Sequence, residues 1–176
     1  MAKKPKKQSK DNQRSAIDVV IETPKSSRNK YAYDEKARRF RLSKVLAEGM
    51  MFPYDFGFVP GTRSDDGDPL DVLVLMDEPT FPGCVVECRL IGVLQAEQEE
   101  EGEMKRNDRL IAVANASQTY ADIRNISDLS DAIVRQVEGF FVNYQALRDV
   151  RFTVLGRKGA AAAATTLRAN RERKSA

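Results

Sequence analysis

Short apolar runs separated by turn residues constrain the fold of this chain more than any other feature. The runs are rich in valine, leucine and isoleucine, and they occupy residues 17–23, 40–45, 71–76, 84–96 and 109–114. Proline and glycine lie between them, for example at Pro53, Pro60-Gly61 and Pro82-Gly83. Runs of this length and composition, bounded by such residues, predict β-strands.

The period of the apolar residues changes after these runs. Ile133, Val137, Phe141 and Tyr144 recur at steps of three and four residues, which predicts an amphipathic helix over roughly 129–148. A strand near 151–155 and an alanine-rich helix from about 159 complete the pattern. Many strands followed by helices predict an α+β fold, with a strongly curved antiparallel sheet or a small OB-like β-barrel flanked by two main helices.

The chain has 176 residues, 41% of them hydrophobic, which suits one domain with a buried core. We assign residues 17–176 to this domain and the polar, basic residues 1–16 to a disordered tail. The tail has the charge to touch nucleic acid or anionic lipid. A solubilising extension is favoured, because no basic face with interleaved aromatics accompanies it. No run reaches the roughly 18 apolar residues of a membrane span, so we expect a cytoplasmic protein without membrane contact.

The sequence contains no histidine. Ser-His and Cys-His catalysis are therefore excluded, as is a zinc site with histidine ligands. The two cysteines, Cys84 and Cys88, lack the spacing of a zinc CxxC pair, and we interpret them as small buried hydrophobes. Chemistry here must rest on carboxylates, lysine, arginine and tyrosine.

Carboxylates gather in the segment Asp66-Gly67-Asp68-Pro69-Leu70-Asp71, which runs directly into an apolar strand. In an extended chain Asp66 and Asp68 project to one side, and Pro69 turns the chain so that Asp71 can join them. Three carboxylates held so close together repel one another, and divalent cations are the usual remedy. Oxygen-only ligands favour Mg²⁺ or Mn²⁺.

Other interpretations of this segment fit less well. A solvated surface loop is the simplest of them and stays open. An EF-hand loop starting at Asp66 needs an oxygen ligand at position 70 and glycine at 71, and Leu70 and Asp71 fail both conditions. A phosphatase with an aspartyl nucleophile places its Asp-x-Asp after a buried strand, whereas here the buried strand follows the acids.

The segment from Asp66 to Val72 resembles in full the signature of family I soluble inorganic pyrophosphatases of the bacterial type. The neighbouring sequence agrees in order and spacing over about 17–156. The matching segments are Ile21-Glu22-Thr23-Pro24, Lys30-Tyr31, Phe52-Pro53-Tyr54-Asp55-Phe56-Gly57-Phe58, Pro82-Gly83, Gly92-Val93-Leu94, and Phe140-Phe141 with Tyr144.

This resemblance implies a Mg²⁺-dependent enzyme that hydrolyses inorganic pyrophosphate to two phosphates. It implies that Asp66 and Asp71 bind metal, that Glu22 holds a further metal on the substrate side, and that Asp68 orients or deprotonates the attacking water. It assigns Asn107 to the metal site as well. The residues that it implies for phosphate binding are Lys30, Lys44, Arg109 and Tyr144.

Several positions differ from the family pattern. Ala32 replaces a glutamate, Lys44 an arginine, Phe52 and Phe56 two tyrosines, Asn107 an aspartate, and Arg109 and Gln145 two lysines. A second late aspartate aligns near Gln98 or Glu99, so the acid in residues 97–103 that replaces it stays open. The changes spare the metal-binding acids and fall on the phosphate-binding shell.

Two hypotheses follow from this pattern. The first is a working Mg²⁺-dependent diphosphatase, and slow turnover or an altered phosphate substrate stays open for it. The second is a non-catalytic binding or assembly module that keeps the fold with an eroded site. The resemblance also implies a homo-oligomer, specifically a hexamer.

Overall fold

Five strands close into a small barrel in this computed structural model, which describes residues 16–175 and the side chains of 16–171. The predicted basic tail lies outside the described residues, except that Ala16 begins the first strand. The strands pair in a ring, with β6 returning to β1. In ring order they are β1 (Ala16–Thr23), β4 (Asp55–Phe58), β5 (Asp71–Leu75), β8 (Arg109–Ala114) and β6 (Val85–Glu100).

The pairing is antiparallel everywhere in the ring except between β5 and β8, which run parallel. The prediction of a small curved barrel is confirmed, and the parallel pair refines it. It arises because the chain leaves β5, forms the long strand β6 and turns back to insert β8 between β5 and β6.

Four further strands lie outside the ring. β7 (Glu103–Arg106) and β9 (Phe152–Gly159) both pair with β6, while β2 (Asn29–Asp34) and β3 (Arg39–Val45) form a separate two-stranded sheet. The acidic residues 97–103 form the tip of the β6–β7 hairpin, with its turn at Glu101 and Gly102.

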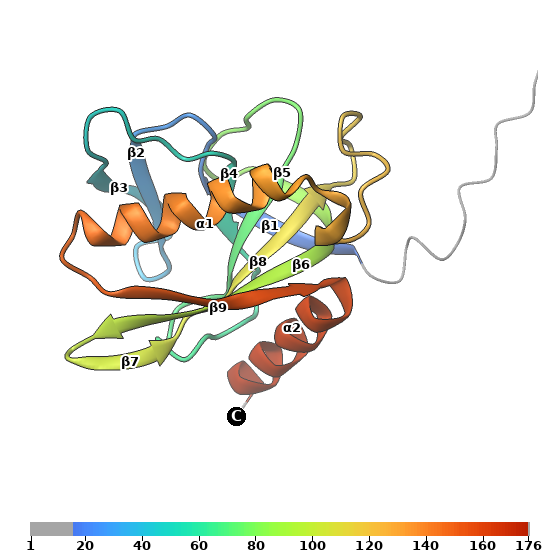
Figure 1. Cartoon of the computed structure of the whole chain (residues 1–176). Helices are drawn as coiled ribbons and strands as arrows, with labels where there is room; N and C mark the ends of the chain where they lie inside the picture. The colour runs from blue at the N-terminus through green and yellow to red at the C-terminus, as the bar shows by residue number, and fades with distance from the viewer. Residues whose placement is uncertain (1–15, 176) are drawn as a thin grey trace, which may run out of the picture.

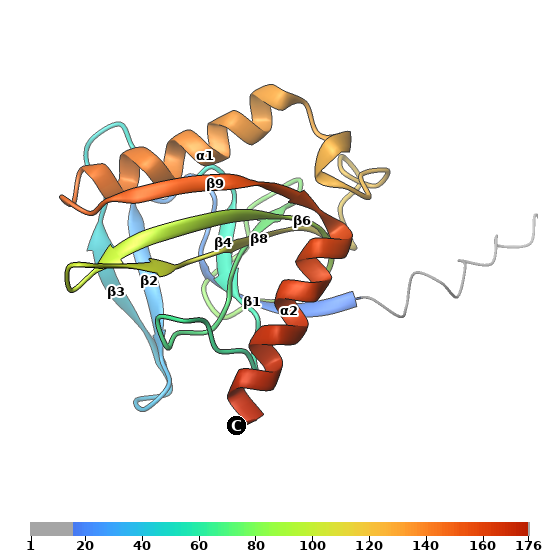
Figure 2. The ribbon, with the colours of Figure 1, turned by 60° about the horizontal axis from the view of Figure 1, so that its bottom comes forward.

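Two helices cover opposite sides of the sheet, as predicted. α1 (Asp131–Ala146) packs against β9, and α2 (Ala160–Ser175) packs against β6 and β9. Figures 1 and 2 show them on either side of β9. Ser130 caps the N-terminus of α1, since its side chain accepts a hydrogen bond from the Ile133 N–H.

Alternating side chains of the central strands supply two hydrophobic clusters. Leu73 and Leu75 of β5 join the cluster that contains Phe141 of α1. Val72 and Val74 of the same strand join the cluster that contains Leu167 of α2. This period of two is what a strand buried on both faces requires, and it fixes the register of the barrel.

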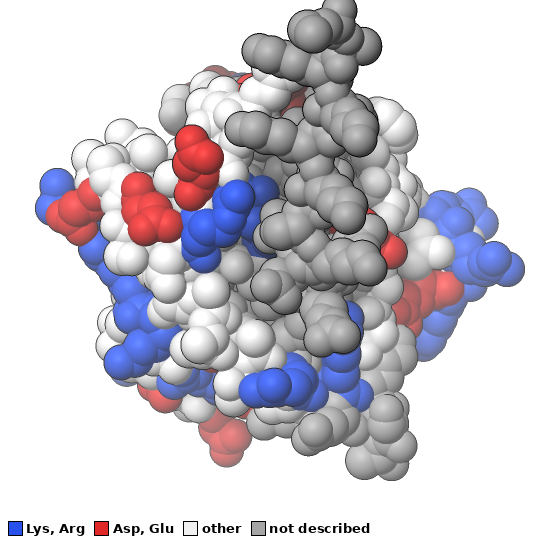
Figure 3. All heavy atoms as spheres, turned by 90° about the vertical axis from the view of Figure 1, so that its right-hand side faces the viewer, with Lys and Arg blue, Asp and Glu red and all other residues white. Residues whose placement is uncertain are grey.

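Three further predictions, on membrane spans, the cysteines and surface charge, can be compared with the structure. Among the described residues, no helix is long and apolar enough to cross a bilayer. Cys88 is fully buried, as predicted, and Cys84 is half-buried. On the face in Figure 3, the basic and acidic side chains of the described residues are interspersed, so this view does not show the single-sign surface typical of nucleic-acid binding.

Candidate functional site

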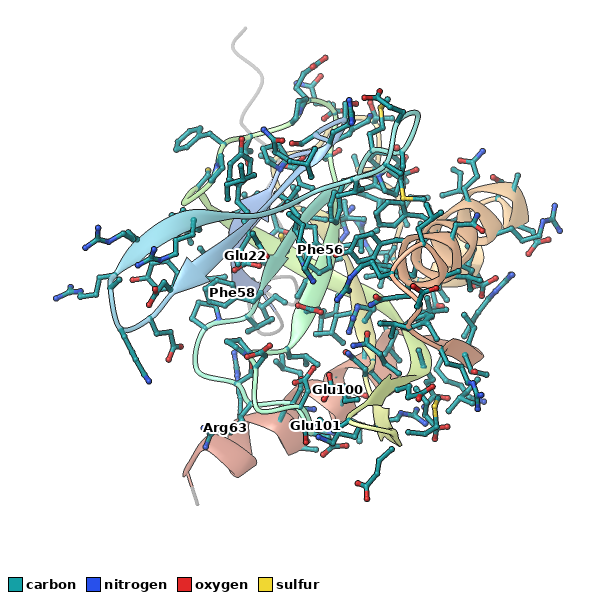
Figure 4. All side chains as sticks on the ribbon, turned by 90° about the vertical axis from the view of Figure 1, so that its left-hand side faces the viewer. Glu22, Phe56, Phe58, Arg63, Glu100 and Glu101 are labelled. Atoms are coloured by element: carbon teal, nitrogen blue, oxygen red, sulfur yellow. The ribbon has the colours of Figure 1, made fainter. Side chains whose placement is uncertain are left out.

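A cleft of about 720 Å³ opens where the β2–β3 hairpin, the loop between β4 and β5, the β6–β7 hairpin and the end of α1 meet. Figure 4 looks at this side, with Glu22 on the sheet beside the hairpin and Glu100 near the β6–β7 turn. All but one of the predicted site residues line this cleft. They are Glu22, Lys30, Lys44, Asp66, Asp68, Asp71, Asn107 and Arg109.

Strand pairing brings residues from distant parts of the sequence into the cleft. β5 and β8 run parallel with Val72 opposite Leu110, so Asp71 and Arg109 begin neighbouring strands. Their side chains form a salt bridge of 3.0 Å that is largely shielded from solvent. Asp71 also lies opposite Phe58 of β4, and β4 pairs with the end of β1, where Glu22 lies.

Gly57 permits the close approach of β4 and β1. A Cβ at this position would lie 2.0 Å from the carbonyl oxygen of Val20, which no side chain tolerates. Only glycine therefore allows β1 to carry Glu22 this close to the loop acids.

The loop that carries Asp66 and Asp68 is closed at its base by two buried hydrogen bonds. The Thr62 hydroxyl donates to the Val59 carbonyl at 2.7 Å and accepts from the Leu70 N–H at 2.9 Å. Within the loop, the Asp68 N–H donates to the Asp66 carboxylate at 3.1 Å. These bonds hold the two acids at the mouth of the barrel, next to Asp71.

Burial and mutual repulsion make these carboxylates unusually easy to protonate. Burial, and then the charges of Asp71 and Asp68, raise the pKa of Glu22 to about 7, although a 2.7 Å hydrogen bond from the Tyr33 N–H opposes the shift. Burial raises the pKa of Asp66 to about 6, again with a contribution from Asp71 and Asp68. Burial and the charge of Asp71 likewise raise the pKa of Asp68. Negative charge is thus poorly compensated on this wall of the cleft.

This donor set suits a hard divalent cation. Among residues 16–171, no three acidic or cysteine side chains are already grouped tightly enough to hold a metal ion between them. Mg²⁺, however, keeps several waters and needs only one or two carboxylates together with substrate oxygens. Oxygen donors that repel one another in its absence fit such an ion.

The opposite wall of the cleft is cationic. Lys30 of β2 lies opposite Lys44 of β3 in the hairpin, and both line the cleft. Burial, followed by the charges of Arg148 and Lys30, lowers the pKa of Lys44. Arg109 differs from these lysines because it is buried and engaged by Asp71 and by the Asn107 side chain.

Tyr144 is the predicted site residue that does not line the cleft. Its ring packs parallel to Phe140 at 5.8 Å, and it is buried in the cluster under α1. Its hydroxyl has no hydrogen-bond partner among the described residues. Lys30 lies 5.9 Å from the centre of the ring, so Tyr144 supports the cationic wall from behind.

Several side chains that line the cleft were not among the predicted site residues, including Asp34 and Glu35 of the β2–β3 hairpin as well as Gln98, Glu100 and Arg148. The side-chain oxygen of Gln98 accepts hydrogen bonds from the side-chain amides of Gln145, at 2.6 Å, and Asn107, at 3.3 Å. The Arg148 guanidinium donates to the side-chain oxygen of Gln145 at 2.6 Å. Of the acids in residues 97–103, Glu100 lines the cleft. The family pattern pointed to residues 97–103 without choosing an acid, and it gave no signal for Arg148, because the other cations of the cleft are distant from it in sequence.

Comparison with known proteins agrees with this geometry. The family model described as inorganic pyrophosphatase matches residues 19–175. A curated protein from Synechocystis named inorganic pyrophosphatase is 40% identical over 142 residues, covering 81% of this chain and 82% of the relative.

Solved structures give the same result. The crystal structure of the inorganic pyrophosphatase from Thermus thermophilus superposes with a TM-score of 0.86 at 34% identity, covering 96% of this chain and 95% of the other. The inorganic pyrophosphatase from Helicobacter pylori gives 0.86 at 30% identity, covering 97% and 100%. A barrel of this topology, with an acidic wall facing a cationic one and sequence similarity over nearly its whole length, places the chain in the inorganic pyrophosphatase family.

Proposed function

We propose that the chain hydrolyses inorganic pyrophosphate to two phosphates with the help of Mg²⁺. The observation that carries this proposal is the division of one cleft into a wall of poorly compensated carboxylates and a wall of cations. Pyrophosphate is a small polyanion, so a site for it must supply positive charge on every side. The cationic wall supplies part of that charge, and the acids recruit the rest as metal ions.

Each group of residues has a separate task in this proposal. Glu22, Asp66 and Asp71 would hold Mg²⁺, which when bound neutralises phosphate oxygens and lowers the pKa of water. Asp68, the exposed acid between them, would orient the attacking water and accept its proton. Lys30 and Lys44 would bind the phosphate oxygens from the hairpin. Asn107 would serve the metal side as a neutral ligand.

Arg109 has a different task from the lysines. Its salt bridge with Asp71 and its burial between the Phe141 and Phe152 rings fix its position. We assign it to holding Asp71 in place while its charge faces the cleft. Tyr144 supports Lys30 through its ring.

Phosphate release from pyrophosphate by the full chain, with and without millimolar Mg²⁺, tests the proposal. Mg²⁺-dependent release above background is expected, with Mn²⁺ as the second metal to try. No release with either metal would refute the enzymatic proposal and leave a non-catalytic module of the same fold as the better account.

We propose further that the chain forms a homo-oligomer, with the hexamer as the expected state. Several large apolar side chains are exposed on the barrel and hairpin, among them Leu42 and Val45 of β3, and Phe81 and Val85 near the start of β6. Large apolar side chains that are exposed on a single chain can be buried where copies associate. Sedimentation at micromolar concentration is the test, and a monomer would contradict this proposal.

A further inference from the structure

We propose that Arg148 binds the phosphate groups of the substrate directly, as the third member of the cationic wall. The inference rests on the proposed function and adds a substrate-binding residue to it. Arg148 lies just after the end of α1 and lines the cleft. It reaches the cleft from an element that carries none of the predicted metal ligands.

The first observation is where the guanidinium lies. It stacks over the Tyr144 ring, 5.4 Å from the ring centre, and the same ring is 5.9 Å from the Lys30 ammonium. Lys30 is in turn the cross-strand partner of Lys44. One aromatic ring therefore gathers cations from α1 and from the hairpin at the same side of the cleft.

The second observation is that these cations form no ion pair with a carboxylate. Among the described side chains, no carboxylate lies within ion-pair distance of Lys30, Lys44 or Arg148. Glu22 and Asp68 attract Lys30 at longer range, and Lys30 opposes the rise of their pKa values. Arg148 and Lys30 nevertheless repel Lys44, and this repulsion contributes to the lowered pKa of Lys44. A polyanion in the cleft removes this repulsion, which is the condition for tight anion binding.

The third observation is how Arg148 is held. One guanidinium nitrogen donates to the side-chain oxygen of Gln145 at 2.6 Å. The side-chain amide nitrogen of Gln145 donates in turn to the side-chain oxygen of Gln98 at 2.6 Å. Gln145 is buried and neutral, so it orients Arg148 without competing for an anion. An arginine has five N–H donors, and this contact leaves most of them for phosphate oxygens.

Gln145 stands where the family resemblance places a lysine, and Arg148 follows it by three residues. Arg148 lies just past the end of α1, and its guanidinium reaches back to the Gln145 side chain at 2.6 Å. The positive charge has therefore moved along the end of α1 and has not been lost. A lysine at 145 beside the present Arg148 would place two cations at hydrogen-bond distance, so these two positions depend on each other.

The experiment moves the charge between the two positions. It compares wild type with Arg148→Gln, Gln145→Lys and the double variant Gln145→Lys/Arg148→Gln. Arg151→Gln is the matched control, because Arg151 is an exposed arginine on the neighbouring turn that pairs with Glu99 and does not line the cleft. For each protein we would measure kcat and KM for pyrophosphate with Mg²⁺, the Kd of imidodiphosphate by calorimetry, and the melting temperature.

Arg148→Gln is expected to raise KM and the Kd of imidodiphosphate by roughly tenfold or more, the usual effect of losing one charged hydrogen-bond donor. Arg151→Gln should stay within about twofold, since exposed ion pairs contribute little. Gln145→Lys alone removes the side-chain oxygen that orients Arg148, so it should weaken binding, and the double variant, which keeps one cation at this end of the cleft, should recover most of the loss. Recovery of binding in the double variant is not expected if Arg148 has only a structural role.

Two results would overturn the inference and leave the diphosphatase standing. One is an Arg148→Gln protein that behaves like Arg151→Gln. The other is a loss that follows the melting temperature and is not recovered in the double variant, which would make Arg148 a structural residue. If wild type neither hydrolyses pyrophosphate nor binds imidodiphosphate, the proposed function fails and the inference fails with it.

Discussion

The two walls of the cleft are built in different ways. The acidic wall comes from the barrel itself, with Glu22 at the end of β1, Asp71 at the start of β5 and the loop acids in between. The cationic wall comes from outside the ring, with Lys30 and Lys44 on the β2–β3 hairpin and Arg148 after α1. The first wall inherits the rigidity of a closed sheet, whereas the second depends on how two peripheral elements dock.

This difference separates what each wall contributes. In the proposed function the acids need a fixed geometry, because they would hold metal and activate water, which tolerate small errors poorly. The cations would bind a polyanion from several directions, so each would make a partial contribution. We therefore expect changes to the acidic wall to affect turnover most strongly, and changes to the cationic wall to affect substrate binding.

The largest effect is expected for Asp68→Asn. The change removes the proton acceptor at nearly constant volume, so turnover should fall by about 10²–10³-fold while the melting temperature without metal stays similar. Phosphate release at saturating Mg²⁺ is the measurement. Asp65→Asn is the matched control, because Asp65 is an exposed acid in the same loop that does not line this cleft. Equal losses in both variants would remove the distinction between Asp68 and its neighbours.

Next in size is Lys30→Gln on the cationic wall. Loss of a charge that stacks on Phe56 and Tyr144 should raise KM roughly tenfold, with a smaller change in kcat. Steady-state kinetics separates the two parameters. Lys25→Gln serves as the control, since Lys25 stacks on Tyr54 and does not line the cleft. A fall confined to kcat would show that the two walls do not divide their tasks as described.

A smaller effect concerns stability against pH. A carboxyl group whose pKa is raised on folding stabilises the folded state below its unfolded pKa, and this contribution is lost as pH rises through the folded value. For Glu22 that window runs from 4.5 to about 7. In EDTA the melting temperature should therefore fall across this window, and each kcal/mol lost corresponds to about 2–4 °C for a chain of this size.

Added Mg²⁺ should reverse that fall at neutral pH, since a ligand of the folded state stabilises it. Glu22→Gln should flatten the slope in EDTA. Asp77, whose hydrogen bonds lower its pKa to about 2, acts in the opposite direction and only in more acidic solution. Thermal melting from pH 4 to 8, with and without Mg²⁺, would show the window, and a flat profile in EDTA would contradict the account of the acidic wall.

The smallest effect is expected for Asn107→Asp, which tests how far the acidic wall extends onto β8. The new charge would face Arg109, which already donates to the Asn107 oxygen, so the fold should accept it. Mg²⁺ affinity should rise by about three- to tenfold, because affinity follows the charge of the ligands. Asn115→Asp adds the same charge outside the cleft and should leave Mg²⁺ affinity unchanged. Calorimetric titration with Mg²⁺ compares the two.

The sequence predicted the parts of the molecule where the pattern is local. α1 and the apolar strands follow a period that burial dictates, so their positions agree with the structure to within a few residues. β2, β4 and β7 were not predicted. β4 is only four residues long and contains Gly57, while β7 has a single apolar residue, Met104, and is stabilised by its pairing with β6.

The candidate site divides in the same way. Asp66, Asp68 and Asp71 lie within six consecutive residues, so their proximity was predicted from spacing, and all three line the cleft. Gln98 and Gln145 are 47 residues apart, and nothing local predicts that they share a hydrogen bond. Arg148 could not be distinguished from any exposed arginine before the fold placed it over Tyr144.

The parallel pairing of β5 with β8 has a consequence for the lifetime of the site. Val72–Leu75 and Leu110–Val113 pair in register directly after Asp71 and Arg109, and nearly all of these residues are inaccessible to solvent. Backbone amides in such strands exchange with solvent only when the whole domain unfolds. The backbone that carries Asp71 and Arg109 is therefore protected by the global stability of the barrel. The β2–β3 hairpin is joined to β1 by local hydrogen bonds, in which the Tyr31 and Tyr33 N–H groups donate to Thr23 and Glu22. Loss of the acidic wall thus requires unfolding of the domain, whereas the position of the hairpin depends on a few local contacts.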